Sequence, residues 1–106
     1  MYKNHRDISQ ENAMFKIESK EFIREFSIDI NAAVDKYLDK TIELKGEITE
    51  IEKDNFILNN TIVCYADSIA LLQISVSEAF IVKGRIIGYD ELLEQIKLDQ
   101  VTIINP

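Results

Sequence analysis

Apolar and polar residues alternate most regularly between residues 41 and 51. One phase of this alternation is apolar or glycine and holds Ile42, Leu44, Gly46 and Ile48. A period of two residues is typical of a strand with one buried face. The phase shifts by one residue near Thr49–Glu50, which predicts a β-bulge there. We therefore predict a long, bent strand, of the kind that pairs with two neighbours in a small closed barrel.

The segment 79–87 repeats part of this pattern. Leu44-Lys45-Gly46-Glu47-Ile48 and Val82-Lys83-Gly84-Arg85-Ile86 share the order apolar, lysine, glycine, charged, isoleucine. In both, glycine takes an inward position where a side chain is expected. Glycine inside a strand usually marks a sharp bend or a close approach of another chain segment. We predict that these two glycines lie on neighbouring, paired strands that bend to close the barrel.

Three further strands are predicted from apolar runs bounded by turn residues, at 56–58, 61–66 and 93–104. Asn59-Asn60 is typical of a tight turn with positive φ, and a phase change near Asp99-Gln100 predicts a second bulge. Residues 67–78 are expected to form a crossover with at most a turn or two of helix. This strand order predicts a five-stranded Greek-key barrel, the OB-fold, in preference to a five-stranded meander or an SH3-like barrel.

Residues 15–39 carry helical spacing. Phe15-Lys16-Ile17 is expected to lead into a helix with Ser19 as its N-cap, and Asp29 is expected to cap a second helix. Their apolar stripes contain Phe22, Ile23, Phe26, Ile30, Val34, Tyr37 and Leu38. We predict one kinked helix or two short helices that cover an end of the barrel; the alternative is that the stripe binds a partner.

The predicted fold class is therefore mainly β with N-terminal helices (α+β). The predicted organisation is a polar N-terminal arm at 1–14 and a single OB-like domain at 15–106. That domain divides into a helical segment at 15–39 and a β-barrel at 40–106. The only histidine, His5, lies in the arm and is expected to be solvent-exposed.

Composition narrows the possible functions. The 106 residues carry 19 acidic and 12 basic side chains, for a net charge of −7, which works against binding to phosphate backbones or anionic membranes. Cys64 is the only cysteine, so no intrachain disulfide is possible, and we expect it to be buried. No long apolar run and no charged-then-apolar leader is present, so the chain as given is expected neither to span a membrane nor to carry an intact signal peptide.

The sequence offers little chemistry for catalysis. It has no glycine-rich phosphate loop, no histidine or cysteine pair and no nucleophile elbow. Asp90, Glu91 and Glu94 cluster near a turn, but they lack the alternating spacing of a calcium loop, and we expect a solvated loop there. We therefore predict a protein that is not an enzyme and that has no cofactor and no metal site.

The run Ala33-x3-Tyr37-Leu38-Asp39-Lys40-x-Ile42-Glu43-Leu44-Lys45-Gly46-Glu47-Ile48, followed by Val82-Lys83-Gly84-Arg85-Ile86, resembles the tRNA-anticodon-like family of bacterial OB-fold proteins. The resemblance covers about residues 21–104 and implies a helical segment followed by a barrel. It also implies an envelope lipoprotein or a membrane-tethered protein, in which Met1 would replace a removed leader. The chain departs from the family at Ser77-Glu78, where glycine is usual.

Two kinds of ligand remain. Single-stranded nucleic acid needs a basic track with aromatic rings for stacking, and the candidate residues on the outer barrel face are Lys45, Phe56, Tyr65, Lys83, Arg85 and Tyr89. The alternative use of the basic residues is cross-strand ion pairing, for example with Glu43 and Glu47. Because of the net charge we prefer a non-catalytic binding module for a protein, peptide or glycan of the cell envelope. Nucleic-acid binding is the alternative.

Overall fold

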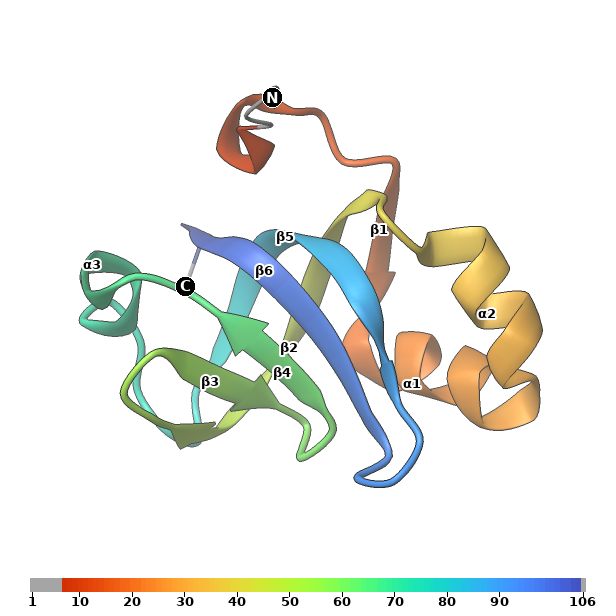
Figure 1. Cartoon of the computed structure of the whole chain (residues 1–106). Helices are drawn as coiled ribbons and strands as arrows, with labels where there is room; N and C mark the ends of the chain where they lie inside the picture. The colour runs from red at the N-terminus through yellow and green to blue at the C-terminus, as the bar shows by residue number, and fades with distance from the viewer. Residues whose placement is uncertain (1–6, 106) are drawn as a thin grey trace.

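The computed structural model describes residues 7–105, so the predictions about His5 and Met1 lie outside the described residues. Strands hold more of these residues than helices do, and short helices connect or flank them (Figure 1). In chain order the elements are η1 (Ile8–Gln10), β1 (Phe15–Glu18), α1 (Ser19–Ile28), α2 (Ile30–Tyr37), β2 (Thr41–Ile51), β3 (Asn55–Leu58), β4 (Ile62–Tyr65), α3 (Ser68–Leu71), β5 (Ala79–Asp90) and β6 (Gln95–Asn105).

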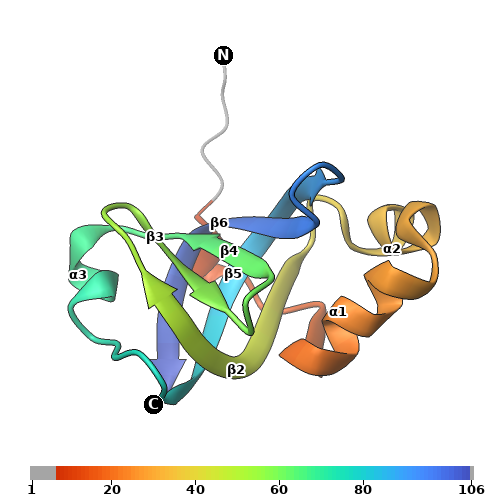
Figure 2. The same cartoon turned by 90° about the horizontal axis from the view of Figure 1, so that it is seen from below.

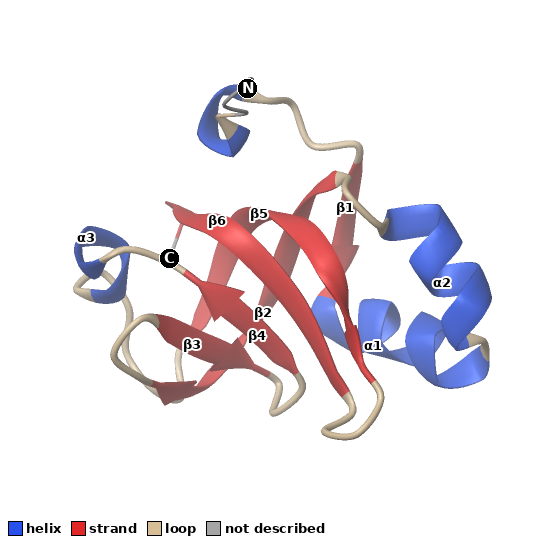
Figure 3. Ribbon diagram, viewed as in Figure 1, coloured by secondary structure: helices blue, strands red, loops and turns tan. Residues whose placement is uncertain are grey.

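Five of the strands close into a barrel in the order β2-β3-β4-β6-β5, and β5 pairs back onto β2 (Figure 3). The β4–β6 pairing is parallel, whereas the other pairings within the barrel are antiparallel. Gly46 lies opposite Phe80 and Gly84 lies opposite Ile42, so both glycines are on neighbouring, paired strands as predicted. The predicted α+β fold with an OB-like closed barrel is confirmed.

Local features of the strands also agree with the alternation in the sequence. The β2–β3 register shifts between Ile48 and Glu50, which is the bulge expected near Thr49–Glu50. On β6, Thr102 pairs with Lys83 and Asp99 pairs with Arg85, so three steps on β6 match two steps on β5. Gln100 lies inside this second bulge with a φ of 50°. The turn residues Asn59 and Asn60 have φ values of 50° and 61°, as the turn prediction required.

Two helices, α1 and α2, pack on one side of the barrel, opposite the short α3 (Figure 2). Asp29 separates them and caps α2 by accepting a hydrogen bond from the Ala32 amide at 3.1 Å. Phe22, Phe26 and Tyr37 are buried in the same cluster as the apolar residues of the barrel. The aromatic part of the predicted stripe is therefore core.

The residues before α1, which were expected to lead into the helix and were placed in the helical segment 15–39, form a strand. β1 runs parallel to β2 and pairs Phe15 with Ile42 and Ile17 with Leu44. It covers the edge of β2 that β3 leaves open, because β3 pairs only beyond residue 47. Ser19 is the first residue of α1 and is not its cap. Its hydroxyl is buried and, among residues 7–105, has no hydrogen-bond partner.

Part of the predicted polar arm, 1–14, lies against the barrel, because η1 contacts β5 and β6. Ile8 is 0% exposed, and η1 lies over β5 and β6. The Met14 amide donates to the Thr41 carbonyl oxygen at 2.8 Å. One isoleucine gives no periodic pattern, so the sequence held no sign of this contact.

Candidate functional site

Lys83 lies on the outer side of β5, and its ammonium group is hydrogen-bonded to the N-terminal segment. Its Nζ donates to the carbonyl oxygens of Ser9 at 3.0 Å and Glu11 at 2.9 Å. The strand register also places Lys83 opposite Glu43. A lysine held by two carbonyl oxygens of its own chain is poorly placed to bind a phosphate group.

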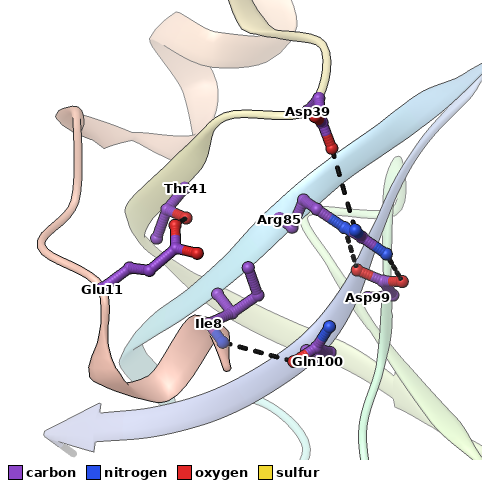
Figure 4. A network of polar contacts seen from close by, with 7 residues as sticks. All are labelled: Ile8, Glu11, Asp39, Thr41, Arg85, Asp99 and Gln100. Atoms are coloured by element: carbon purple, nitrogen blue, oxygen red, sulfur yellow. Dashed lines mark hydrogen bonds and ion pairs between the residues drawn. The ribbon is translucent and has the colours of Figure 1, made fainter. Parts of the chain in front are cut away.

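Arg85 forms a bidentate ion pair with Asp99 on β6 (Figure 4). Nε donates to Oδ1 at 2.9 Å and Nη2 donates to Oδ2 at 2.6 Å, and Nη1 lies 3.8 Å from the Asp39 carboxylate. Paired guanidinium and carboxylate groups of this geometry are among the stronger polar contacts in proteins. The ion pairing expected from the sequence is therefore present, but with Asp99 and Asp39 instead of Glu43 or Glu47.

Lys45 is the exposed member of the three predicted basic residues. It lies on β2 beside Glu18 of β1 and Ile81 of β5. Exposed Glu47 lies on the same side of the strand. The three residues therefore do not form a continuous basic track on the outer face.

The predicted aromatic residues are also separated. Phe56 is 0% exposed and packs in the core, so its ring has no surface for a ligand. Tyr89 stacks on Phe26 of α1 with ring centroids 5.4 Å apart. Burial, followed by the nearby carboxylates of Glu94, Glu91 and Asp90, raises the pKa of Tyr89. Tyr89 also lines a cavity of about 480 Å³ beside the β5–β6 turn, and Tyr65 lines a second open cavity.

This cavity lies at the end of β4 and has a volume of about 560 Å³. Tyr65 and Ala66 come from β4 and the residue after it, whereas Gln100, Val101 and Thr102 come from β6. The remaining lining residues belong to the β2–β3 turn, the loop before α3 and the N-terminal segment, namely Asp54, Asp67, Asp7 and Ser9. The parallel β4–β6 pairing brings residues 65 and 100–102 to the same end of the barrel.

Among residues 7–105, the charged residues that line the cavity are all carboxylates. Asp7 accepts from the amide and hydroxyl of Ser9, Asp67 accepts from the Ala70 amide at 2.9 Å, and Asp54 accepts from the Asn55 side chain at 2.8 Å. Each contact uses Oδ1 alone, so the second oxygen of each carboxylate can accept a further hydrogen bond. Asp7 and Asp67 are also the N-caps of η1 and α3, and Asp54 lies in the turn between β2 and β3. None of the three was among the site residues predicted from the sequence.

Acidic groups continue along the adjoining strand. A hydrogen bond with Glu52, reinforced by the charge of that neighbour, raises the pKa of Glu50. Both side chains are exposed at the end of β2. The surface near the β2–β3 turn therefore carries negative charge, which repels phosphate groups.

Other kinds of site find little support in the structure. Within residues 7–105, no group of three or more His, Cys, Asp and Glu side chains is placed to hold a metal ion. Cys64 is buried as predicted, and burial raises the pKa of its thiol. Across the same residues, every helix is too short or too polar to cross a membrane.

Comparisons with known proteins support the fold. No protein-family model matches the chain, and no curated protein matches its sequence. Among solved structures, it is similar to a "putative nucleic acid-binding lipoprotein" from Klebsiella pneumoniae, with a TM-score of 0.70 and 14% sequence identity. The match covers 85% of this chain and 91% of that chain. The tRNA-anticodon-like resemblance stays a prediction, and the chain shares its fold with this lipoprotein.

Proposed function

We propose that the protein is a non-catalytic OB-like binding module whose ligand occupies the Tyr65 cavity and is neutral or cationic. The observation that carries this proposal is the charge of the lining, where Asp7, Asp54 and Asp67 are the charged residues. A glycan and a basic segment of a protein or peptide both fit this description. The lipoprotein named above is consistent with a binding role for the fold.

The chemistry of the cavity favours these two ligands. The Tyr65 ring can stack on the apolar face of a sugar or lie under a cationic side chain. The carboxylates, together with Gln100 and Thr102, supply acceptors for sugar hydroxyls or for an ammonium group. OB-fold barrels are known to bind both oligosaccharides and oligonucleotides.

Single-stranded nucleic acid is the second candidate, and the name of the Klebsiella protein is the observation in its favour. Against it stand the net charge of −7 and the internal contacts of Lys83 and Arg85. A nucleic-acid site needs basic side chains that can release counterions from the phosphates. Of the three candidate basic residues this leaves Lys45, and a single lysine makes a weak site for phosphate groups.

Amide chemical shifts measured by NMR during titration test the proposal. The probes are a neutral chito-oligosaccharide, an oligolysine peptide and a single-stranded oligonucleotide. We expect one of the first two to shift the amides of Tyr65, Ala66 and Thr102, and Tyr65→Ala to weaken that binding by about tenfold or more. Lys45→Ala, on a different surface, is the matched control and should leave the affinity for that ligand unchanged. Shifts caused by the oligonucleotide alone would overturn the proposal.

A further inference from the structure

The docked segment, residues 7–14, contains a fully buried residue that does not belong to the barrel core. Ile8 is 0% exposed, yet it is not a member of the hydrophobic cluster formed by the barrel and helices α1 and α2. It is covered because η1 lies on the outer side of β5 and β6. The burial of Ile8 therefore depends on a surface contact between two separate parts of the chain.

Side chains of the barrel hold the main chain of the docked segment. The Ile8 amide donates to Gln100 Oε1 at 3.3 Å (Figure 4). Lys83 Nζ donates to the carbonyl oxygens of Ser9 and Glu11. Such contacts recognise groups that every peptide possesses, and they are typical of surfaces that bind extended peptides.

Two side chains of the docked segment make contacts with the barrel that favour a particular sequence. Ile8 supplies the buried apolar group, and Glu11 Oε1 accepts from Thr41 Oγ1 at 2.6 Å. The segment has one turn of 3-10 helix, at Ile8–Gln10, which is too short to be stable alone. Its conformation therefore depends on the surface beneath it.

The charges of the two partners are complementary. The surface presents Lys83, while the segment carries Asp7 and Glu11. Arg85, farther along β5, is already paired with Asp99 and Asp39. A peptide that replaces the segment would need an aliphatic residue followed three positions later by an acidic residue. An acidic, extended segment of a partner protein has this chemistry.

We propose that Thr41, Lys83 and Gln100 form a peptide-docking surface, which residues 7–14 fill in the free protein and which an acidic, extended segment of a partner protein fills by displacing them. Binding at this surface does not require a ligand in the Tyr65 cavity. The two sites are neighbours that share Gln100, because Asp7, Ser9 and Gln100 also line that cavity. Displacement would open that side of the cavity.

A competition experiment on the full chain tests the proposal. A tethered segment has an effective concentration on the order of millimolar, so a peptide added to the wild type must compete with it. Ile8→Asp removes the apolar group and weakens the internal contact. The probe is a fluorescent peptide with the sequence of residues 7–14, and the control peptide has aspartate in place of isoleucine.

We expect Ile8→Asp to bind the probe peptide about tenfold or more tightly than the wild type does. Adding Lys83→Ala or Gln100→Ala to this variant should weaken that binding again. The control peptide should bind poorly to every variant. Equal binding of both peptides, or no gain in the Ile8→Asp protein with its native circular dichroism spectrum, would overturn the proposal.

Amide hydrogen exchange of the wild type gives an independent result if Ile8→Asp does not fold. A displaceable segment detaches while the barrel stays folded, so the amide hydrogens of Ile8 and Met14 should exchange with solvent roughly 100-fold faster than that of a barrel amide. The Ile96 amide, bonded to the Thr61 carbonyl oxygen at 3.0 Å, is a suitable reference. Equal exchange rates would mean that the segment is an inseparable part of the fold, and the proposal would fail.

Discussion

Replacing Gly46 with alanine tests why the long strand β2 carries a glycine. A Cβ atom at this position would lie 2.3 Å from Ser19 Oγ and 2.6 Å from Asn59 Oδ1. Both distances are far below van der Waals contact. The glycine therefore allows the first residue of α1 to approach the strand, in addition to any role in its bend.

The expected cost follows from these contacts. Overpacking of a close contact typically costs about 1–3 kcal/mol, and the lower chain entropy of alanine returns roughly 0.5–1 kcal/mol. Asn59 cannot move freely, because its Oδ1 accepts from the Glu47 amide at 3.1 Å. We expect Gly46→Ala to lower the free energy of unfolding by about 1–2 kcal/mol. In a domain of this size that is a fall in Tm of roughly 5–10 °C.

A double-mutant cycle identifies the clash. Ser19→Ala removes the hydroxyl, which is buried without a hydrogen-bond partner among the described residues, and by itself should leave stability unchanged or raise it by up to about 1 kcal/mol. In the double variant the shortest contact is absent, so the cost of Gly46→Ala should fall by at least about 0.5 kcal/mol. Urea unfolding followed by circular dichroism measures all four proteins, with Lys45→Ala as the control next to the glycine.

Two results would refute this reasoning. The first is a Gly46→Ala protein that unfolds at the same urea concentration as the wild type. The second is a cost of Gly46→Ala that is equally large with and without Ser19→Ala. Either result would mean that the close approach of α1 is not what this glycine permits.

Three further predictions concern other contacts. Tyr37 Oη donates to Glu25 at 2.5 Å; burial opposes ionisation of Glu25, but this bond and that of Lys36 lower its pKa. The contact therefore stabilises the folded protein at pH values above the pKa of Glu25 in the unfolded chain, and this stabilisation is lost as the pH falls through the pKa of Glu25 in the folded protein. Tyr37→Phe should lower the free energy of unfolding by about 1 kcal/mol at pH 7 and by much less at acid pH. Urea unfolding at both pH values measures the difference. Asp99→Asn should lower stability by about 1 kcal/mol, less at high salt, because it weakens the pair with Arg85. Cys64 should react with a thiol reagent only as fast as the barrel unfolds, and rapid labelling of the native protein would contradict its burial.

Much of the barrel could be predicted because its signals are local. The alternation on β2, the Lys-Gly repeat on β5 and the Asn59-Asn60 turn each act within a few residues, and a bulge shows itself as a phase change. Which residues of a short strand face the core cannot be predicted in this way. For β3, the sequence does not say whether Phe56 or Ile57 faces inward, and only the pairing with β4 places Phe56 in the core.

The rest depends on contacts between residues far apart in the chain. Phe15-Lys16-Ile17 is a strand because the edge of β2 is open there, and nothing near these residues reveals that edge. Lys83 was predicted as a ligand-binding residue because its position is outward. Its contacts with Ser9 and Glu11 bridge more than 70 residues, so no local pattern could reveal them. The Tyr65 cavity is likewise assembled from four separate segments.

We propose that the outer face of this barrel does not bind nucleic acid, because two of its three candidate basic residues, Lys83 and Arg85, contact the protein itself. Fluorescence anisotropy of a labelled single-stranded oligonucleotide tests it most directly, at two salt concentrations of about 50 and about 200 mM. We expect binding weaker than about 100 μM at the higher salt concentration, even with the wild-type chain in large excess. A micromolar Kd that weakens steeply with salt would contradict it.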